Sequence, residues 1–372
     1  MTKPLELFVS TAPGLEPTTL REIDALGLAH ARTLPGGVVV TGHPTTALRL
    51  LLSLRTASHV LARVARFRAD RFERLEREVR EVDWPALLVP HVPRSFRASA
   101  EKSRLHHTGA IAERLARFVR ESMGDDPPSA SDEQPGVTIA ARFSHDECTL
   151  SIDLSGAPLH RRGYRLDPGR APLREDLAAA LVLESGWDRA APLVDPMCGS
   201  GTIAIEAALL ATRTAPGLAR DFAIERTKLV TASHVEAARE KARAEIVPLR
   251  APVVASDRDE AAARRTRANA ERAGMAIEVA HAPLSETPAL RFAGARPAVV
   301  TNPPWGERLT DGGAGLERLH AALGDLVRAL GPEARLAMIA HDPRLARRVG
   351  LSLRSAFLTD AGGMKVHALV HP

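Results

Sequence analysis

Residues 302–305 read Asn-Pro-Pro-Trp and follow a short apolar run, residues 298–301, that predicts a buried strand. Proline fixes its own φ and restricts the residue before it, so the two prolines stiffen this segment. The Asn302 amide and the Pro303 carbonyl can then be held as acceptors beside the flat ring of Trp305. Such a site suits a planar group with an NH2, because two acceptors take its hydrogens while the ring stacks on its face. An isolated Asn-Pro-Pro also forms ordinary turns, so the interpretation depends on residues upstream.

A glycine-rich turn upstream, in residues 194–202, reads Val-Asp-Pro-Met-Cys-Gly-Ser-Gly-Thr between a predicted strand and a predicted helix. Glycines let a backbone pass close to a ligand, and free N–H groups at a helix start bind carboxylates. The turn lacks both the GxGxxG fingerprint of dinucleotide folds and the Gly-Lys-Thr of a phosphate loop. Asp257 ends the next apolar run, where carboxylates accept hydrogen bonds from ribose hydroxyls. The pattern predicts a nucleoside-like ligand that need not carry phosphates.

Other polar residues nearby have structural interpretations. Cys198 in the glycine turn is expected to pack as a small side chain rather than to act as a nucleophile. Glu206 is expected to be structural, and Asn269 is expected at the surface of its helix. His106 and His107 have no matching Cys/His set, so no metal site is expected there.

The composition excludes several classes of protein. Two cysteines, Cys148 and Cys198, cannot form a disulfide framework or a cysteine metal cage. No apolar run reaches about 18 residues, and the first residues lack the basic-then-apolar layout of a secretory signal. We therefore expect a cytoplasmic protein that has no membrane span and no metal ion. We also expect it to be a monomer.

Positive charge is concentrated in one part of the chain. The formal net charge is +5, whereas residues 49–120 alone hold 16 Lys and Arg against 8 Asp and Glu. A basic segment inside a near-neutral protein indicates a docking surface for a polyanion. Residues 71–80 within it mix both signs at helical spacing, which also fits a solvated helix that pairs with itself.

Apolar periodicity divides the chain into two kinds of organisation. The first half predicts a small α+β unit, with strands at residues 5–10, 36–41, 94–100, 137–143 and 147–154 and helices at 14–26, 45–54 and 108–123. Later, strand–helix units repeat, which indicates a mainly parallel sheet with helices on both faces. Its strands are expected at residues 193–195, 252–257, 298–301 and 335–340, and its helices at 172–184, 202–212, 260–273 and 315–330.

The two aspartates, the glycine turn and the Asn-Pro-Pro-Trp segment together resemble class I S-adenosylmethionine-dependent methyltransferases. More narrowly, nearly the whole chain resembles the THUMP-domain RNA methyltransferases that modify guanine N2, which include bacterial large-subunit rRNA enzymes and tRNA-acting relatives. The resemblance is carried by residues 7–16 (LFVSTAPGLE), 102–107 (KSRLHH), 153–165 (DLSGAPLHRRGYR), 171–175 (APLRE), 195–206 and 302–309 (NPPWGERL).

The resemblance implies an α/β fold in which a C-terminal Rossmann-like class I methyltransferase domain, with a mostly parallel seven-stranded sheet, follows an α+β ferredoxin-like and THUMP region. The implied domains are a ferredoxin-like subdomain at residues 1–50, an RNA-binding THUMP domain at 51–160 and the methyltransferase domain at 161–372. The domain break is expected near residues 163–169. The implied cofactor is S-adenosylmethionine and the implied partner is RNA, either rRNA or tRNA. No second methyltransferase domain follows, as it does in some fused relatives, so we expect one modification only.

Three groups of site residues follow from the resemblance, position by position. The cofactor-binding group has its methionine end at the glycine turn and its ribose end at Asp257; it comprises Asp195, Pro196, Cys198, Gly199, Gly201, Thr202, Asp257 and Asn302. The catalytic group holds the target amine and comprises Asn302, Pro303 and Trp305. The RNA-binding group comprises Lys102, Arg104, His107, Arg162 and Arg165, of which the last two are alternatively part of a solvated hinge between domains.

The chain departs from the family pattern at three positions. Residues 280–284 lack the acid that commonly lies near the adenine amine, Pro297 replaces an Asp, and Trp305 replaces Tyr or Phe. Trp stacks on a base at least as well as the smaller rings do, so the last change is expected to be tolerated.

The leading hypothesis is direct, in-line methyl transfer to guanine N2. Large-subunit rRNA (23S) is favoured over tRNA because the motif spacing resembles the bacterial rRNA enzymes. Methylation of an adenine N6 amine or a glutamine amide also fits the Asn-Pro-Pro-aromatic site, although the THUMP-like half argues against both. A non-catalytic RNA-binding relative is the remaining alternative; the missing acid near Ala282 favours it, and the intact set of Asp195, Asp257 and Asn302 opposes it.

Overall fold

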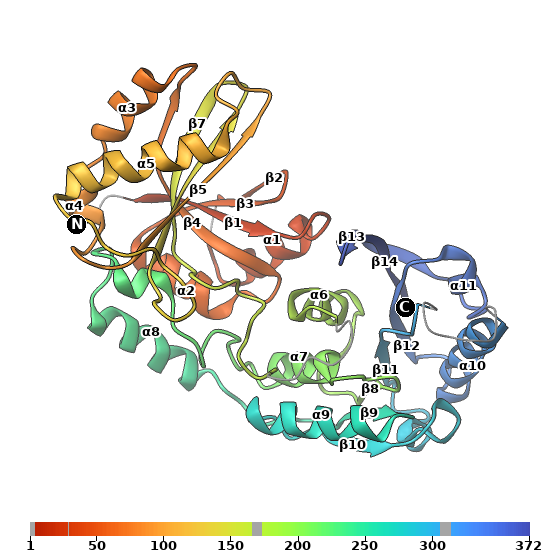
Figure 1. Cartoon of the computed structure of the whole chain (residues 1–372). Coiled ribbons are helices and arrows are strands. Elements are labelled where there is room, and N and C mark those ends of the chain that lie inside the picture. Colours follow the sequence, from red (N-terminus) through yellow and green to blue (C-terminus); the bar gives the residue numbers. More distant parts are fainter. Residues whose placement is uncertain (1–3, 29, 166–172, 306–313) are drawn as a thin grey trace. The chain divides into compact units, whose positions relative to one another are not determined.

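The computed structural model describes residues 4–28, 30–165, 173–305 and 314–372 (Figure 1). Some of the family motifs, residues 171–172 and 306–309, lie outside the described residues, as does part of the expected break at residues 163–169. The chain forms two compact units, each built on its own seven-stranded sheet. The first unit contains the chain up to Thr11, Leu20–Leu159 and Arg220–Ala242, and the second contains Ala12–Thr19, His160–Ala219 and Arg243–Pro372.

The sheet of the first unit has the strand order β2-β3-β1-β4-β7-β6-β5. Strand β4, Ala57–Arg68, is central because β1 pairs with it on one side and β7 on the other. One continuous sheet therefore crosses the expected boundary at residues 50 and 51, and the division into three domains remains a prediction. The other strands are β1 Leu5–Thr11, β2 Arg32–Leu34, β3 Gly37–Gly42, β5 Arg94–Glu101, β6 Val137–Ser144 and β7 Glu147–Asp153.

Two helices of this unit agree closely with the apolar pattern. Helix α5, Thr108–Met123, has the predicted bounds and ends at Gly124, whose φ of 67° is the left-handed conformation that glycine adopts at little cost. Helix α3, Phe72–Arg80, is amphipathic and ion-paired: Arg80 lies 3.0 Å from Glu76 within the helix and also pairs with Glu121 of α5, so its pairing is only partly with itself. Other α-helices with residues in the first unit are α2 Pro44–Ser53, α4 Trp84–Leu87 and α8 Ala232–Ala244; α1 Glu16–Ala25 has its first four residues in the second unit and the rest in the first.

The sheet of the second unit has the order β10-β9-β8-β11-β12-β14-β13. Its first five strands in this order are mutually parallel, while β14 runs antiparallel to both β12 and β13. The predicted mostly parallel seven-stranded sheet is therefore confirmed. Its strands are β8 Leu193–Asp195, β9 Val253–Asp257, β10 Glu278–His281, β11 Ala298–Thr301, β12 Arg335–Ala340, β13 Arg354–Ala361 and β14 Met364–His371.

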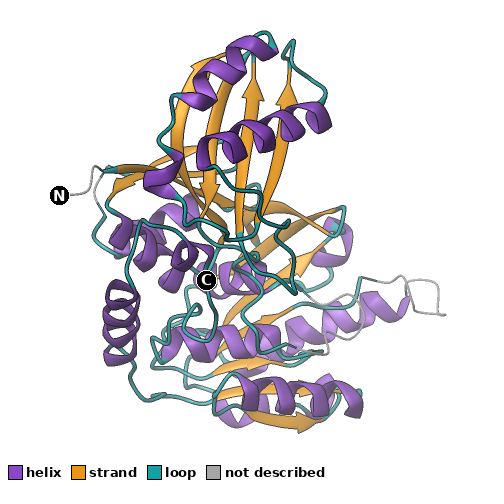
Figure 2. Cartoon of the chain, turned by 60° about the vertical axis from the view of Figure 1, so that its left-hand side comes forward, coloured by secondary structure: helices purple, strands orange, loops and turns teal. Residues whose placement is uncertain are grey.

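Both faces of this second sheet are covered by helices (Figures 1 and 2). Strand β11 shows the consequence: Ala298 and Val300 belong to one apolar cluster and Val299 to the other. Apolar side chains at successive positions are buried on opposite faces, which is why the strand reads as an unbroken apolar run. The helices are α6 Glu175–Glu184, α7 Thr202–Ala211, α9 Glu260–Arg272, α10 Ala314–Leu330 and α11 Pro343–Arg347.

None of the helices in the described part of the chain combines the length and apolarity that crossing a bilayer requires. The same residues contain no group of three or more His, Cys, Asp or Glu side chains arranged to hold a metal ion.

Candidate active site

The carboxyl ends of three neighbouring parallel strands bring the predicted site residues to one edge of the second sheet. Strand β8 lies between β9 and β11, with Val194 opposite both Val254 and Val299. Asp195 ends β8, Asp257 ends β9, and Asn302 follows β11. The three residues are far apart in the sequence but lie at the ends of neighbouring strands. Ligands of open parallel sheets bind at this edge.

The glycine turn between β8 and α7 needs glycine at two positions for different reasons. Gly199 and Gly201 have φ of 56° and 82°, in the left-handed region. A Cβ added at Gly201 would lie 2.6 Å from Cγ2 of Thr266, so that position has no space for a side chain. A Cβ at Gly199 would meet nothing within 4 Å in the described structure, so the space beside that backbone is open. The turn is thus packed tightly at Gly201 and open at Gly199.

Two side chains of helix α9 donate hydrogen bonds to the carbonyls of this turn. The buried Asn269 amide donates to the Ser200 carbonyl at 2.9 Å, and the buried Thr266 hydroxyl donates to the Gly199 carbonyl at 3.1 Å. The expectation that Asn269 lies at the surface is therefore wrong: it is fully buried because it satisfies a turn carbonyl. Its spacing of three from Thr266 puts both polar side chains on one helix face, which is the signal that could have revealed the pair.

Asp257 supports the turn from the neighbouring strand. Its Oδ2 accepts the Gly199 N–H at 2.9 Å and its Oδ1 accepts the Asp259 N–H at 2.9 Å. Each carboxylate oxygen keeps acceptor capacity for a further donor, so these bonds leave room for ribose hydroxyls. Asp259 caps α9 by accepting the Ala261 N–H at 2.9 Å. The ribose role of Asp257 remains a prediction.

Asp195 is only 1% exposed, and its Oδ1 accepts the Thr301 hydroxyl at 2.8 Å. Burial raises the pKa of Asp195 to about 7, although the hydrogen bonds from Thr301 and from the Met197 N–H oppose the rise. The side chain can therefore change its charge near neutral pH. Thr301 is a site residue that the sequence analysis did not single out; it lies one position before Asn302, at the end of the buried strand.

Cys198 behaves as a packed thiol. It is buried, its Sγ lies 3.4 Å from the Thr266 hydroxyl, and burial raises its pKa far above the ordinary range of a cysteine. A nucleophilic cysteine needs an accessible thiolate, so this environment favours the packing interpretation.

The Asn-Pro-Pro-Trp segment is held by its own last residue. Trp305 Nε1 donates to Asn302 Oδ1 at 3.1 Å, a bond that the Tyr or Phe common in the family cannot make in this way. The amide oxygen of Asn302 has a second lone pair, so it can still accept a hydrogen from a target amine. Trp305 also stacks with His341, with ring centroids 6.0 Å apart and an interplanar angle of 27°. Asn302 and Trp305 are half-buried and Pro303 is buried.

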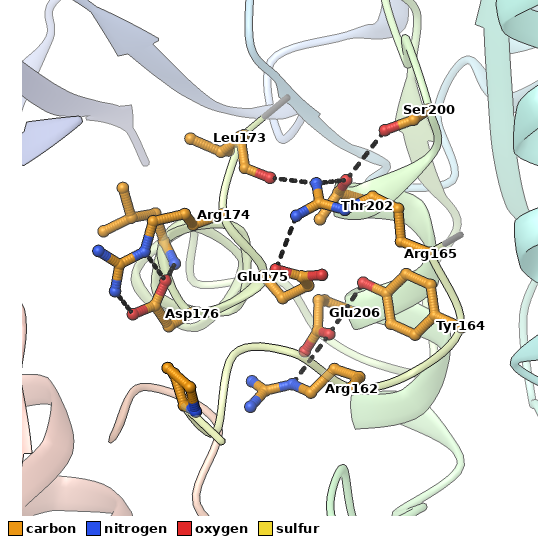
Figure 3. Close-up of polar contacts among 12 residues, drawn as sticks. Arg162, Tyr164, Arg165, Leu173, Arg174, Glu175, Asp176, Ser200, Thr202 and Glu206 are labelled. Atoms are coloured by element: carbon orange, nitrogen blue, oxygen red, sulfur yellow. Dashed lines mark hydrogen bonds and ion pairs between the residues drawn. The ribbon is translucent and has the colours of Figure 1, made fainter. Parts of the chain in front are cut away.

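Two of the predicted RNA-binding residues lie inside the second unit, in a cluster of charged residues beside the glycine turn (Figure 3). Arg162 is 3% exposed, and its Nε lies 3.4 Å from Glu206, which also accepts the Tyr164 hydroxyl at 3.1 Å. Arg165 donates to Glu175 at 2.9 Å and to the Thr202 hydroxyl at 3.4 Å. These arginines are satisfied by buried protein groups rather than presented at a surface, and the structural interpretation of Glu206 agrees with its contacts.

Glu175 in this cluster has an unusual protonation equilibrium. Burial raises its pKa to about 7, while the guanidinium of Arg165 opposes the rise. Through its hydrogen bonds to Glu175 and Thr202, Arg165 links the first turn of α6, where Glu175 lies, to the start of α7. The cluster therefore holds the first residue of α7, the helix that follows the glycine turn.

The other predicted RNA-binding residues lie in one loop of the first unit. Lys102, Arg104 and His107 are all exposed between β5 and α5. The loop is fastened by Asp146, whose carboxylate accepts the Arg104 N–H at 2.7 Å. Their contact with RNA remains a prediction.

The missing acid near the adenine position is a feature of this chain. Strand β10 is followed by Ala282, whose N–H donates to the Asp257 carbonyl at 3.0 Å. Backbone of this segment is thus tied directly to the residue expected to hold the ribose.

Comparison with known families finds two matches in this chain. The family described as an RMKL-like methyltransferase domain matches residues 162–356, and the RlmL ferredoxin-like domain matches residues 6–61.

Known proteins match over the whole chain. A curated relative, ribosomal RNA large subunit methyltransferase K/L of Syntrophotalea carbinolica, is 34% identical over 99% of this chain and 54% of its own length. The chain spans about half the length of the curated relatives it matches. Among solved structures, SMU.472 complexed with SAH has a TM-score of 0.88 at 27% identity, covering 100% of this chain and 98% of that one. A Listeria monocytogenes protein described as a predicted N6-adenine-specific DNA methylase has a TM-score of 0.86 at 27% identity, covering 98% of this chain and 96% of its own.

Proposed function

Because the chain belongs to the RMKL-like methyltransferase domain family, we propose that it transfers a methyl group from S-adenosylmethionine to the N2 amine of a guanine in 23S rRNA. The observation that carries this proposal is the convergence of Asp195, Asp257 and Asn302 at one edge of the parallel sheet. The open glycine turn would hold the methyl donor. The Asn302 amide oxygen and the Pro303 carbonyl, on the next strand's end, would hold the amine that accepts the methyl group.

The residues of the turn fit the proposed cofactor. The open space at Gly199 admits a ligand against the backbone, and the half-buried Asp257 offers acceptors to ribose hydroxyls. The related structure SMU.472 is complexed with SAH, the product form of the same cofactor, which supports this assignment. When bound, S-adenosylmethionine supplies a methyl group activated by a sulfonium centre.

The chain's own residues then position the amine. Asn302 Oδ1 and the Pro303 carbonyl accept its two hydrogens, which turns the nitrogen lone pair away from the acceptors. Once the nitrogen carries the methyl group, one of these two hydrogens leaves as a proton to water. Trp305 stacks on the base and, through its N–H bond to Asn302, holds the amide oxygen in place. The rate enhancement comes from positioning, which can lower a barrier by about 7–11 kcal/mol in well-oriented systems.

Two observations support RNA as the substrate: the basic segment of the chain and its similarity to a curated rRNA methyltransferase. The chain has a basic segment at residues 49–120, with Lys102, Arg104 and His107 exposed. The relative from Syntrophotalea carbinolica carries the name of a large-subunit rRNA methyltransferase. We further propose that the protein works in the cytoplasm as a monomer without a metal ion.

A second candidate is methylation of an adenine N6 amine, since the Listeria monocytogenes neighbour is described as an N6-adenine-specific DNA methylase. Both amines present two hydrogens to the same acceptors, so the product nucleoside decides between them.

The test is transfer of labelled methyl from S-adenosylmethionine to separate 23S rRNA and tRNA preparations, followed by digestion to nucleosides. We expect N2-methylguanosine from 23S rRNA. Asn302→Ala should abolish transfer, by at least about a hundredfold. Labelled N6-methyladenosine would replace the leading proposal by the second candidate, and an absence of cofactor binding in the wild-type protein would refute both.

A further inference from the structure

A cavity of about 910 Å³ opens beside Trp305 in the second unit. Its described lining comes from the segments after β11 and β12 and from α10 and α11, and includes Trp305, Leu316, His341, Arg344 and Arg347. This volume is in the range of sites that bind small organic molecules. Asn302 and Pro303, the proposed amine acceptors, are not among the described residues that line the cavity.

One wall of the cavity is aromatic. His341 follows β12 and stacks with Trp305 at a centroid distance of 6.0 Å. Both rings are half-buried, so each keeps an accessible part. Two nearly parallel rings in the lining of a cavity form a platform on which a flat heterocycle can stack.

The lining also carries positive charge. Arg348 lies 3.0 Å from Glu317, so its charge is compensated. Arg344 and Arg347 are exposed, and neither has a carboxylate partner among the residues that the structure describes. Asp342 is engaged in capping α11, where it accepts the Arg344 N–H at 2.8 Å. Two guanidiniums three residues apart on one short helix are thus available for a phosphate, which arginine binds through paired N–H donors.

We propose that this cavity binds the nucleotide that neighbours the methylated base in the RNA strand, with its base against His341 and its phosphate on Arg344 and Arg347. The inference rests on the proposed RNA methyl transfer and adds to it a sequence-reading or register-setting site on the methyltransferase unit. The methylated base itself must reach Asn302 and Pro303, which lie outside the described lining. The neighbouring nucleotide is connected to it by one phosphodiester and so comes within reach of the cavity.

The test measures RNA binding and turnover for the full-length chain with a 23S rRNA transcript. His341→Ala should weaken RNA binding by about tenfold, because stacking of one base accounts for roughly that factor. His341→Phe, which keeps a stacking ring, should restore binding to within about twofold. The double variant Arg344→Ala/Arg347→Ala should raise KM for RNA and flatten the dependence of log K on log salt by about 1, the effect of losing one or two phosphate contacts.

The matched control is Arg250→Ala. Arg250 is exposed in the same unit but precedes β9, so it lies at the amino edge of the sheet, opposite the cavity. We expect it to behave as wild type in every assay, and we expect cofactor affinity to be unchanged in all of these variants. Equal KM and salt dependence for the control and the double variant would overturn the proposal, and so would loss of cofactor affinity in the cavity variants.

The outcome is separable from that of the proposed function. If the wild-type chain methylates RNA and the cavity variants do so with unchanged KM, only the cavity proposal fails. If the wild-type chain binds the transcript without methylating it, the proposed function fails, and weaker binding by His341→Ala and the double variant still supports the cavity as a nucleotide site.

Discussion

At the scale of single residues, the sequence predicts which residues lie at the site better than it predicts which partners their side chains contact. Asp195, Asp257 and Asn302 lie at the expected strand ends, because strand ends can be read from apolar runs. The contacts of Asn269 and Arg162 could not be read in the same way. Each is polar and each is buried against a specific partner, and partners distant in sequence are set by tertiary packing.

Trp305 shows how a single substitution from a family pattern acquires a physical meaning. From the sequence it is a larger stacking ring; in the structure its N–H also binds the Asn302 amide oxygen. A neutral hydrogen bond of this kind contributes about 1 kcal/mol, enough to bias the orientation of the amide. The departure from Tyr or Phe therefore adds a fixed acceptor geometry to the stacking surface.

Asp195 gives the molecule a predictable dependence of stability on pH. Its pKa rises from 3.8 to about 7 on folding, so between these values the native protein keeps a proton that the unfolded chain has lost. The stability that this group contributes is fully present below about pH 4 and is lost as pH rises through 7. Relative to Asp195→Asn, which cannot ionise, the ligand-free wild type should lose about 2 kcal/mol of unfolding free energy between about pH 5.5 and 8.

Urea denaturation of wild type and Asp195→Asn at both pH values checks this, and comparing the two proteins cancels the titration of Glu175. Asp188→Asn, at an exposed position, is the control and should follow wild type. Parallel pH profiles for wild type and Asp195→Asn would show that the carboxyl is not desolvated in solution.

At the scale of elements, periodic patterns predict long helices and buried strands well and charged strands poorly. Helix α5 and strands β8 and β11 have the expected bounds, because their apolar positions repeat without interruption. Strand β4 was not expected. Its sequence ASHVLARVARFR alternates arginine with apolar residues. This pattern fits a strand with one solvated face, but from the sequence the arginines were interpreted only as part of a basic docking surface.

The glycine turn offers a paired test at this scale. Gly201→Ala forces a Cβ to within 2.6 Å of Thr266 at a φ of 82°, so it should destabilise the protein by more than the roughly 1–2 kcal/mol of left-handed strain alone. Gly199→Ala adds strain at a φ of 56° without a clash, so it should cost only about 1 kcal/mol. Its Cβ projects into the open space proposed for the cofactor, so cofactor affinity should fall at least about tenfold.

Urea midpoints rank stability for these two variants, and calorimetric titration with S-adenosylmethionine or SAH measures affinity. The expected pattern is a large stability loss for Gly201→Ala and a binding loss out of proportion to stability for Gly199→Ala. Wild-type cofactor affinity in Gly199→Ala would place the cofactor away from this backbone.

At the scale of the whole molecule, the fold class and the mostly parallel sheet were predictable, but the membership of each unit was not. Residues 12–19 pack with the second unit and residues 220–242 with the first, each away from the segments that flank it in the chain. No local pattern signals such an exchange, since apolar periodicity reports that a face is buried without reporting what buries it. The contiguous three-domain division is the simplest choice that a linear reading allows.

Distribution of charge over the whole chain leads to the last prediction. Lys102 and Arg104 lie in an exposed loop after β5, at one edge of the first sheet, and Arg104 remains 73% exposed although it lies 3.0 Å from Asp70. If this loop contacts RNA phosphates, Lys102→Ala/Arg104→Ala should weaken binding to a 23S rRNA transcript and flatten its salt dependence by about 1 to 2. Affinity for the cofactor should not change, because the loop and the glycine turn belong to different units.

Arg32→Ala is the matched control for this loop, since Arg32 is exposed on β2 at the other edge of the same sheet. Filter binding across a range of salt concentrations separates the two cases. Electrostatic contact predicts that only the loop variant changes the slope, whereas a purely diffuse attraction to net charge predicts that each removed arginine or lysine lowers the slope equally. Equal effects per charge would therefore remove this loop from the RNA-binding surface and leave the cavity beside Trp305 as the site to examine for phosphate contacts.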